Sequence, residues 1–182
     1  MRDTSVSSRA TILNAAFDVF SQNLGASLSD VAVAAGVGRA TLHRHFAGRD
    51  DLMVALTLAA SKELDAAVEA AVADCTTYTE ALRVALGAIL PLASRHMFLA
   101  TQTAQHDPRV TETYAAQTRA LADDIEAARA EGTFASDIPT AWIVEAYENL
   151  IYAGWALVVA GEATPKQAAD LAWRTFTQGL KP

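Results

Sequence analysis

Apolar side chains recur at three- and four-residue intervals along most of this chain, the spacing that gathers them on one face of an α-helix. The first such set, formed by Ile12, Leu13, Ala16, Phe17 and Phe20, predicts a helix over residues 8–22. Residues 23–25 finish in a glycine and predict the end of that helix.

Two short helices are predicted next, separated by a glycine. Ser27 is followed three residues later by Asp30, a capping-box pattern that predicts a helix starting at Leu28. Gly36 ends this helix and can adopt the positive φ that a tight turn requires. A second short helix is predicted over about residues 38–46. Two short helices joined in this way are typical of a helix-turn-helix.

The rest of the chain predicts further helices. A long one covers about residues 49–73, and others cover about residues 78–91, 95–105, 108–130, 139–160 and 164–179. Pro91 is predicted to kink or end the helix that contains it. We therefore expect an all-α fold of about nine helices. Residues 1–52 form a three-helix N-terminal domain with the helix-turn-helix, and residues 53–182 form a helical bundle.

Composition agrees with this fold and divides the chain by charge. Hydrophobic residues make up 52% of the 182 residues, and glycine and proline are scarce, which favours helices over disorder. Residues 1–52 hold five arginines and five aspartates, whereas the remainder holds 9 basic and 16 acidic residues, which accounts for the net charge of −7. The charge contrast predicts two functional parts that meet near residue 50.

The sequence predicts a cytoplasmic protein that does not cross a membrane. Its single cysteine, Cys75, cannot form an intrachain disulfide, which fits a reducing compartment. The first ten residues contain no apolar run of the kind found in secretory signals. The longest strongly apolar stretch, Leu150 to Ala160, has 11 residues. It is too short to span a bilayer, which takes about 20 residues.

The helix predicted over residues 38–46 carries the chemistry that DNA recognition requires. A recognition helix inserts side chains from its N-terminal end into the major groove. Gly38 and Ala40 are small enough for close approach, while Arg39 and Thr41 can reach base edges. An isolated arginine on a short helix is usually only solvated. Here the turn and the cluster of donors both favour a DNA contact.

Phosphate contacts are predicted around the same helix, where they would position the protein on DNA. Residues 43–45 lie one turn further along the helix predicted over residues 38–46. Arg49 starts the next predicted helix, and Ser27 and Ser29 lie at the start of the preceding one. At both helix starts, free backbone N–H groups can also bind a phosphate. The predicted DNA-binding residues are Ser27, Ser29, Gly38, Arg39, Ala40, Thr41, His43, Arg44, His45 and Arg49.

The segment ATILNAAFDVFSQNLGASLSDVAVAAGVGRATLHRHFAGRDDL resembles the N-terminal DNA-binding domain of the tetracycline-repressor (TetR) family. The resemblance covers roughly residues 9–55, where the first-helix pattern, DVAVAAGV, TLHRHF and RDDL follow one another in the family's order and spacing. It implies a dimeric transcriptional regulator, usually a repressor, that binds a palindromic operator and is released by a small molecule. The family commonly has Tyr at position 43 and Lys at position 49, where this chain has His43 and Arg49.

A ligand pocket in the bundle requires apolar walls and a few polar groups. The absence of clustered charge on the predicted inner faces favours an apolar or aromatic effector, oriented by Tyr114, Thr118 and Tyr147. Ordinary core packing is the alternative for each wall residue. The predicted ligand-binding residues are Leu86, Leu90, Met97, Phe98, Tyr114, Thr118, Leu121, Trp142, Tyr147 and Ile151.

A subunit interface is predicted on the last two helices because the helix over residues 139–160 is apolar on more than one face. Small residues permit close approach of two helices, and aromatic residues are enriched at interface centres. A large apolar patch rarely stays exposed on a monomer. Packing within one subunit is the alternative. The predicted interface residues are Glu148, Tyr152, Trp155, Ala156, Val159, Ala168, Ala169, Ala172, Phe176 and Gly179.

Two other functions are weighed against a DNA-binding repressor. A small helical enzyme is disfavoured because the sequence contains no HExxH, GxSxG, Gly-rich phosphate loop or Cys–His ligand set. His43 and His45 are two residues apart and fall on different helix faces, which disfavours a metal site. No metal or cofactor is therefore predicted. A helix-turn-helix that binds a protein instead of DNA is the third possibility.

Overall fold

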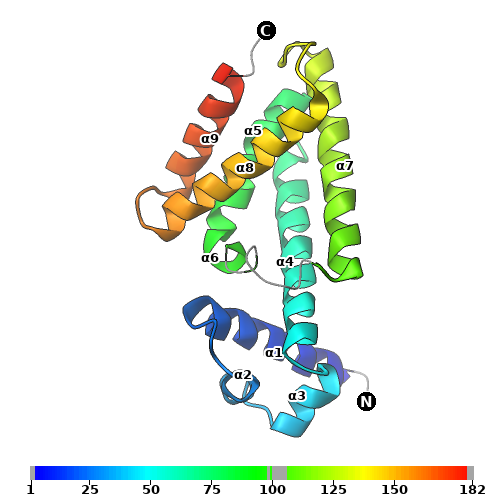
Figure 1. Cartoon of the computed structure of the whole chain (residues 1–182), viewed down its shortest axis with the longest axis vertical. Helices are drawn as coiled ribbons and strands as arrows, with labels where there is room; N and C mark the ends of the chain where they lie inside the picture. The colour runs from blue at the N-terminus through cyan, green and yellow to red at the C-terminus, as the bar shows by residue number, and fades with distance from the viewer. Residues whose placement is uncertain (1–2, 98, 100–105, 180–182) are drawn as a thin grey trace. The chain divides into compact units, whose positions relative to one another are not determined.

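The computed structural model describes residues 3–97, 99 and 106–179, and every regular element within those residues is helical (Figure 1). The predicted all-α fold with an N-terminal helix-turn-helix is confirmed. The helices are α1 (Asp3–Gln22), α2 (Leu28–Ala34), α3 (Arg39–His45), α4 (Arg49–Val72), α5 (Tyr78–Ile89), the 3-10 helix η1 (Leu90–Leu92), α6 (Ala93–His96), α7 (Pro108–Ala130), α8 (Thr140–Val159) and α9 (Pro165–Gly179).

Contacts divide the chain into two compact units. The N-terminal unit comprises residues 1–60 with residues 98–111, and the bundle unit comprises residues 61–97 and 112–182, each as far as the structure describes them. Two helices contribute to both units, because the division falls after Ala60 within α4 and after Thr111 within α7. The first turn of α7 is therefore part of the N-terminal unit.

The N-terminal unit is built around the apolar faces of its helices. Phe20 from α1, Leu42 from α3 and Leu52 from α4 are all fully buried, and Phe46 is buried directly after α3. Because Leu42 and Phe46 lie one turn apart, their burial fixes which face of α3 is turned toward the core. The opposite face of this helix remains available to solvent.

The turn between α2 and α3 follows from local chemistry. Ser27 and Asp30 form the predicted capping box at the start of α2, with the hydroxyl accepting from the Asp30 N–H and the carboxylate accepting from the Ser27 N–H. Gly36 has φ 65°, the left-handed conformation that glycine adopts without strain. The N–H of Val37 then donates to the carbonyl of Ala32, which completes the turn.

The bundle unit has one continuous apolar core, shared by α5, η1, α7, α8 and α9. Pro91 lies in η1, so the predicted break occurs at the end of α5. Opposite it, Gly154 of α8 packs so closely that a Cβ atom there would lie 2.4 Å from a methyl carbon of Leu90. A side chain at position 154 would therefore require the buried Leu90 side chain to shift.

Among the described residues, no helix has the length and apolar character needed to cross a membrane. The apolar stretch from Leu150 to Ala160 forms the second half of α8 and the residue that caps it.

Candidate nucleic-acid interface and effector site

The leading edge of α3 is open to solvent. Gly38, Arg39, Ala40, His43 and Arg44 are exposed, and no hydrogen bond or ion pair with another described residue holds the side chains of Arg39, His43 or Arg44. Thr41 is half-buried on the same turn. The geometry leaves these groups free to meet a ligand, so their role as base and phosphate contacts stays a prediction.

His45 lies differently from its two neighbours on α3. Its ring is turned toward Phe46, with the ring centroids 6.4 Å apart, and its Nε2 atom is buried without a hydrogen-bond partner among the described residues. A buried nitrogen cannot reach a phosphate outside the subunit. Nε2 of His45 is therefore directed into the subunit, and the predicted DNA contact of His45 stays a prediction.

Arg49 is occupied within the subunit. Its guanidinium donates to the carbonyl of Ala26 at 2.5 Å and to the carbonyl of Leu24, and it lies over the ring of Phe20, 4.4 Å from the centroid. These contacts fasten the start of α4 to the loop between α1 and α2. Arg49 therefore has a structural role within the subunit, and its predicted phosphate contact stays a prediction.

Of the two predicted serine contacts, Ser27 is already used by its own helix. Its hydroxyl donates to the carboxylate of Asp30 at 2.8 Å and accepts from the Asp30 N–H at 3.3 Å. The hydroxyl of Ser27 therefore acts as a helix cap, and its predicted phosphate contact stays a prediction. Ser29 is half-buried, and its predicted role stays a prediction.

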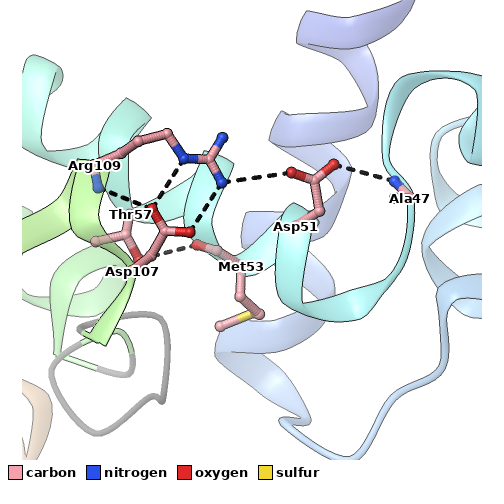
Figure 2. A network of polar contacts seen from close by, with 6 residues as sticks. All are labelled: Ala47, Asp51, Met53, Thr57, Asp107 and Arg109. Atoms are coloured by element: carbon pink, nitrogen blue, oxygen red, sulfur yellow. Dashed lines mark hydrogen bonds and ion pairs between the residues drawn. The ribbon is translucent and has the colours of Figure 1, made fainter.

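A polar network supports the loop that follows α3, as Figure 2 shows. Asp51 accepts from the N–H of Ala47 at 3.1 Å and forms an ion pair with Arg109, at 3.8 Å. Arg109 also binds the carboxylate of Asp107 at 2.9 Å, and this guanidinium lowers the pKa of Asp107. The sequence places Asp51 and Asp107 at helix starts but gives no sign that Arg109 lies within reach of Asp51.

Arg9 on α1 is a further cation that sequence reasoning missed. It is exposed, and its guanidinium lies over the ring of Phe46, 5.1 Å from the centroid. The side chain is thus held beside the C-terminal end of α3. No sequence signal separates Arg9 from any other exposed arginine, because its relation to α3 depends on how α1 packs.

Several residues predicted to line a ligand pocket belong to the core of the bundle unit or to its surface. Leu86 and Leu90 are fully buried in that core. The hydroxyl of Tyr147 donates to the carbonyl of Leu82 at 2.7 Å, and burial raises its pKa. Trp142 is 64% exposed. The predicted pocket roles of Tyr147 and Trp142 stay predictions, while Phe98 lies outside the described residues.

The remaining pocket candidates lie on α6, α7 and α8. Met97, Tyr114, Leu121 and Ile151 are half-buried, and Thr118 is exposed. Burial is the main cause that raises the pKa of the Tyr114 hydroxyl. The half-buried state of these side chains is compatible with a binding surface, so their role stays a prediction.

Glu148 faces α7 instead of a free surface of α8. The hydroxyl of Thr118 donates to its carboxylate at 3.1 Å. Burial raises the pKa of Glu148, the hydrogen bond from Thr118 opposes this, and the charge of Glu145 adds to it. This placement puts a carboxylate beside the predicted pocket residue Thr118, and the predicted interface role of Glu148 stays a prediction.

A row of three rings runs from α6 along α8. His96 and Trp155 have centroids 5.4 Å apart, and Trp155 and Tyr152 have centroids 5.5 Å apart in an edge-on arrangement. Trp155 is only 5% exposed, and its indole N–H donates to the carbonyl of Ile89 at 3.1 Å. Trp155 is therefore a core residue of its own subunit, which corrects its assignment to the interface.

His96 is a buried titratable group in the bundle unit. It is 7% exposed, and its Nε2 atom has no hydrogen-bond partner among the described residues. Burial, with a smaller contribution from the charge of Arg95, lowers its pKa from 6.5 to about 4. The imidazole is consequently neutral at neutral pH.

The small residues of α9 also turn inward. Ala168, Ala169, Ala172 and Phe176 are buried within the subunit, and Gly179 is the last residue of α9. This finding corrects the assignment of those four buried residues to a subunit interface. Tyr152, Ala156 and Val159 remain exposed on α8. These three residues share an exposed stripe of α8, and their interface role stays a prediction.

Comparison with known proteins shows that the chain is similar to bacterial regulators. Residues 12–56 match the family described as "Bacterial regulatory proteins, tetR family". The chain is similar to the HTH-type transcriptional repressor LfrR of Mycolicibacterium smegmatis, with 29% identity over 174 residues that make up 94% of this chain and 89% of LfrR.

Solved structures show the same fold. The crystal structure of the TetR-like transcriptional regulator LfrR from Mycobacterium smegmatis in complex with proflavine has a TM-score of 0.79 and 28% identity, covering 96% of this chain and 97% of that one. The fatty acid degradation regulator FadR from Bacillus halodurans has a TM-score of 0.76 and 18% identity, covering 95% and 96%. At the latter identity the likeness supports the fold alone.

Proposed function

We propose that this chain is a transcriptional regulator of the TetR family, a repressor that binds an inverted-repeat operator as a dimer and leaves it when a small aromatic effector binds. The exposed leading edge of α3, with Arg39 unpaired at its start, carries this proposal. On this surface small residues and hydrogen-bond donors alternate along a short helix.

Arg39 and Thr41 are proposed to contact base edges, and His43 and Arg44 to contact phosphates. Arg9 joins them as a phosphate contact, because its guanidinium is exposed beside Phe46. The N-terminal unit has six basic and six acidic residues and no net charge. Binding must therefore depend on where the arginines lie, since overall charge provides no attraction to DNA.

The dimer is proposed to form through the exposed stripe of α8. Tyr152, Ala156 and Val159 recur along one face, and Trp142 continues that face toward the start of the helix. Alanine allows a second helix to approach closely, and the flanking aromatic and branched side chains provide apolar area. A twofold arrangement would place two recognition helices about 34–36 Å apart, one turn of DNA.

The effector is proposed to bind among Tyr114, Leu121, Glu148 and Ile151 in the bundle unit. These residues of α7 and α8 are half-buried, and the hydrogen bond between Thr118 and Glu148 links the two helices. LfrR, whose structure contains proflavine, supports an aromatic effector for this chain as well.

Selection from a randomised duplex pool, followed by gel shift, tests the proposal. An inverted repeat should be enriched, and its affinity should fall steeply as salt rises, because bound phosphates release counterions. Proflavine should then release the operator. Enrichment of no symmetric sequence, with salt-insensitive retention of every duplex, would instead favour a helix-turn-helix that binds a protein.

A further inference from the structure

A guanidinium lies in the first turn of α7, where the helix itself disfavours a positive charge. Arg109 binds the carboxylate of Asp107 through Nε at 2.9 Å and through a terminal nitrogen at 3.1 Å, and the same terminal nitrogen lies 3.8 Å from Oδ1 of Asp51. The start of a helix is the positive end of its dipole, so a cation there costs free energy unless other contacts offset it. Hydrogen bonding to Asp107, with a smaller contribution from the charge of Asp51, raises the pKa of Arg109. These two partners, and not its own helix, explain the position of Arg109.

The turn that carries Arg109 belongs to the N-terminal unit. Residues 106–111 group with residues 1–60, although most of α7 lies in the bundle unit. Val110 is fully buried and is not part of the apolar core of the bundle unit. The carbonyl of Asp107 accepts from the N–H of Val110 at 3.0 Å and from that of Thr111 at 2.9 Å. The backbone on either side of Arg109 is thus held in the unit that contains the helix-turn-helix.

Asp51 connects Arg109 to the end of the recognition helix (Figure 2). Its Oδ1 pairs with the guanidinium, while its Oδ2 accepts from the N–H of Ala47 at 3.1 Å. Ala47 follows Phe46, which caps α3 and is 1% exposed. With one oxygen on each partner, the carboxylate cannot turn without losing a contact. The start of α7 and the loop after α3 are therefore fixed to the same side chain.

We propose that Arg109 is a positioning residue for α3, which it holds through Asp51 and Ala47, so that the start of α7 takes part in operator recognition. This inference rests on the proposed function, because it assumes that α3 binds the operator. It extends the DNA-binding domain beyond residues 1–52, the limit predicted from sequence, by a segment that the sequence pattern places in the bundle. The alternative is a direct phosphate contact, because the side chain of Arg109 is 59% exposed and positively charged.

Hydrogen exchange of the Ala47 amide in the full chain tests the first step without DNA. Arg109→Gln removes the charge and keeps a side chain of similar length. The exchange rate should rise roughly twofold to fivefold, the effect expected from an exposed ion pair. Arg119→Gln makes the same change at an exposed position later on α7 and should leave the rate unchanged. An unchanged rate in Arg109→Gln would overturn the inference.

Operator affinity at several salt concentrations tests the second step. Arg109→Gln should weaken binding to the selected operator roughly twofold to fivefold, with the same salt dependence as the wild type. A positioning residue releases no counterion, whereas a phosphate contact does. If the slope of log affinity against log salt becomes shallower by about one for each arginine removed, Arg109 binds phosphate itself and the inference is wrong.

Asp51→Asn distinguishes the two roles by the sign of its effect. By charge alone, removing a carboxylate from a DNA-binding unit strengthens its attraction to DNA. If Asp51 holds the loop after α3, the same change weakens operator binding by at least as much as Arg109→Gln does, and the double variant is no weaker than Asp51→Asn alone. Asp50→Asn removes an exposed carboxylate outside this network and should not weaken binding. Tighter binding in Asp51→Asn would contradict the inference.

The unfolding midpoint of each variant is measured in urea, so that partial unfolding is not mistaken for a loss of positioning. If Arg109→Gln loses operator affinity while exchange at Ala47 stays the same, the inference fails and the proposed repressor function stands. If the protein selects no operator at all, the proposed function fails, and exchange at Ala47 still decides whether Arg109 holds the loop after α3.

Discussion

The guanidinium of Arg49 donates to the carbonyl oxygen of Ala26 at 2.5 Å, across 23 residues of sequence. The same side chain covers the ring of Phe20, so it links α4, the loop before α2 and the core of α1. A residue that sequence reasoning placed on a phosphate is thus part of the frame that holds the helix-turn-helix. Its loss should reduce stability before it affects recognition.

Arg49→Ala is expected to lower the free energy of unfolding of the N-terminal unit by about 1–3 kcal/mol. This is the range expected when hydrogen bonds from a charged donor and a cation–π contact are lost together. Urea denaturation checks this expectation. Arg44→Ala removes an exposed arginine from α3 and should leave the unfolding midpoint unchanged. Equal stability of Arg49→Ala and the wild type would show that these contacts contribute little.

Arg39→Ala should behave in the opposite way. The side chain is exposed and has no partner among the described residues, so the unfolding midpoint should stay constant. Specific operator binding should weaken by about 1–3 kcal/mol, the range for one lost base contact. Gel shift with the selected operator measures the loss. The matched control is Arg83→Ala, which removes an exposed arginine from the bundle unit. If Arg39→Ala binds the operator as tightly as the wild type does, the proposed contact of Arg39 with a base edge is wrong.

Asp51→Asn tests the network around Ala47. An asparagine cannot pair with Arg109 and accepts a weaker hydrogen bond from the Ala47 N–H than a carboxylate does. Hydrogen exchange of the Ala47 amide should accelerate roughly fivefold, the equivalent of about 1 kcal/mol. The neighbouring Asp50→Asn is the control because Asp50 is exposed and belongs to no part of the network. An unchanged exchange rate at Ala47 would mean that backbone geometry alone protects this amide.

The low pKa of His96 predicts a loss of stability in acid. The unfolded chain takes up a proton at this imidazole near pH 6.5, whereas the folded chain resists until about pH 4. The unfolded state therefore binds more protons between these values, and the free energy of unfolding should fall by roughly 2–3 kcal/mol as pH drops through this window. Denaturation at several pH values measures the slope.

The matched pair for this measurement is His96→Leu and His43→Gln. The first removes the buried imidazole and should flatten the pH dependence over this window. The second removes an exposed imidazole and should leave the slope intact. A slope in His96→Leu as steep as in the wild type would assign the acid sensitivity to another group.

Ala156→Arg tests the proposed subunit interface. Ala156 is exposed at the middle of the α8 stripe, so a long charged side chain should prevent close approach of a second helix and give monomers in sedimentation. Ala130→Arg makes the same change at the exposed end of α7 and should sediment as the wild type does. A stable dimer in Ala156→Arg would exclude this stripe of α8 as the subunit interface. A substitution of Trp155 would not provide the same test, because Trp155 is buried within its own subunit.

The fold could be predicted from sequence because its signals are local. Ser27 and Asp30 cap α2 within four residues, Gly36 makes the turn, and Leu42 and Phe46 identify the buried face of α3. Each of these features depends on residues in the same or the next turn. Local periodicity and capping chemistry are sufficient to locate them.

The partners of individual side chains could not be predicted in this way. Periodicity shows that residues 148, 152 and 155 share one side of α8, but not which neighbour covers that side. The structure divides the group: Glu148 bonds to α7, Trp155 bonds to the end of α5, and Tyr152 remains exposed. Arg109 and Asp51 likewise meet only because α7 begins beside α4. Such relations depend on tertiary packing across 30 to 66 residues of chain.

The row of rings on α6 and α8 gives the protein a built-in optical reporter. Trp155 contacts both His96 and Tyr152, so a molecule that settles against Tyr152 changes the polarity around an indole that is otherwise shielded from water. Replacing Trp142 and Trp173 with phenylalanine would leave this single emitter. Occupancy of the bundle could then be followed in real time, without a label and without DNA.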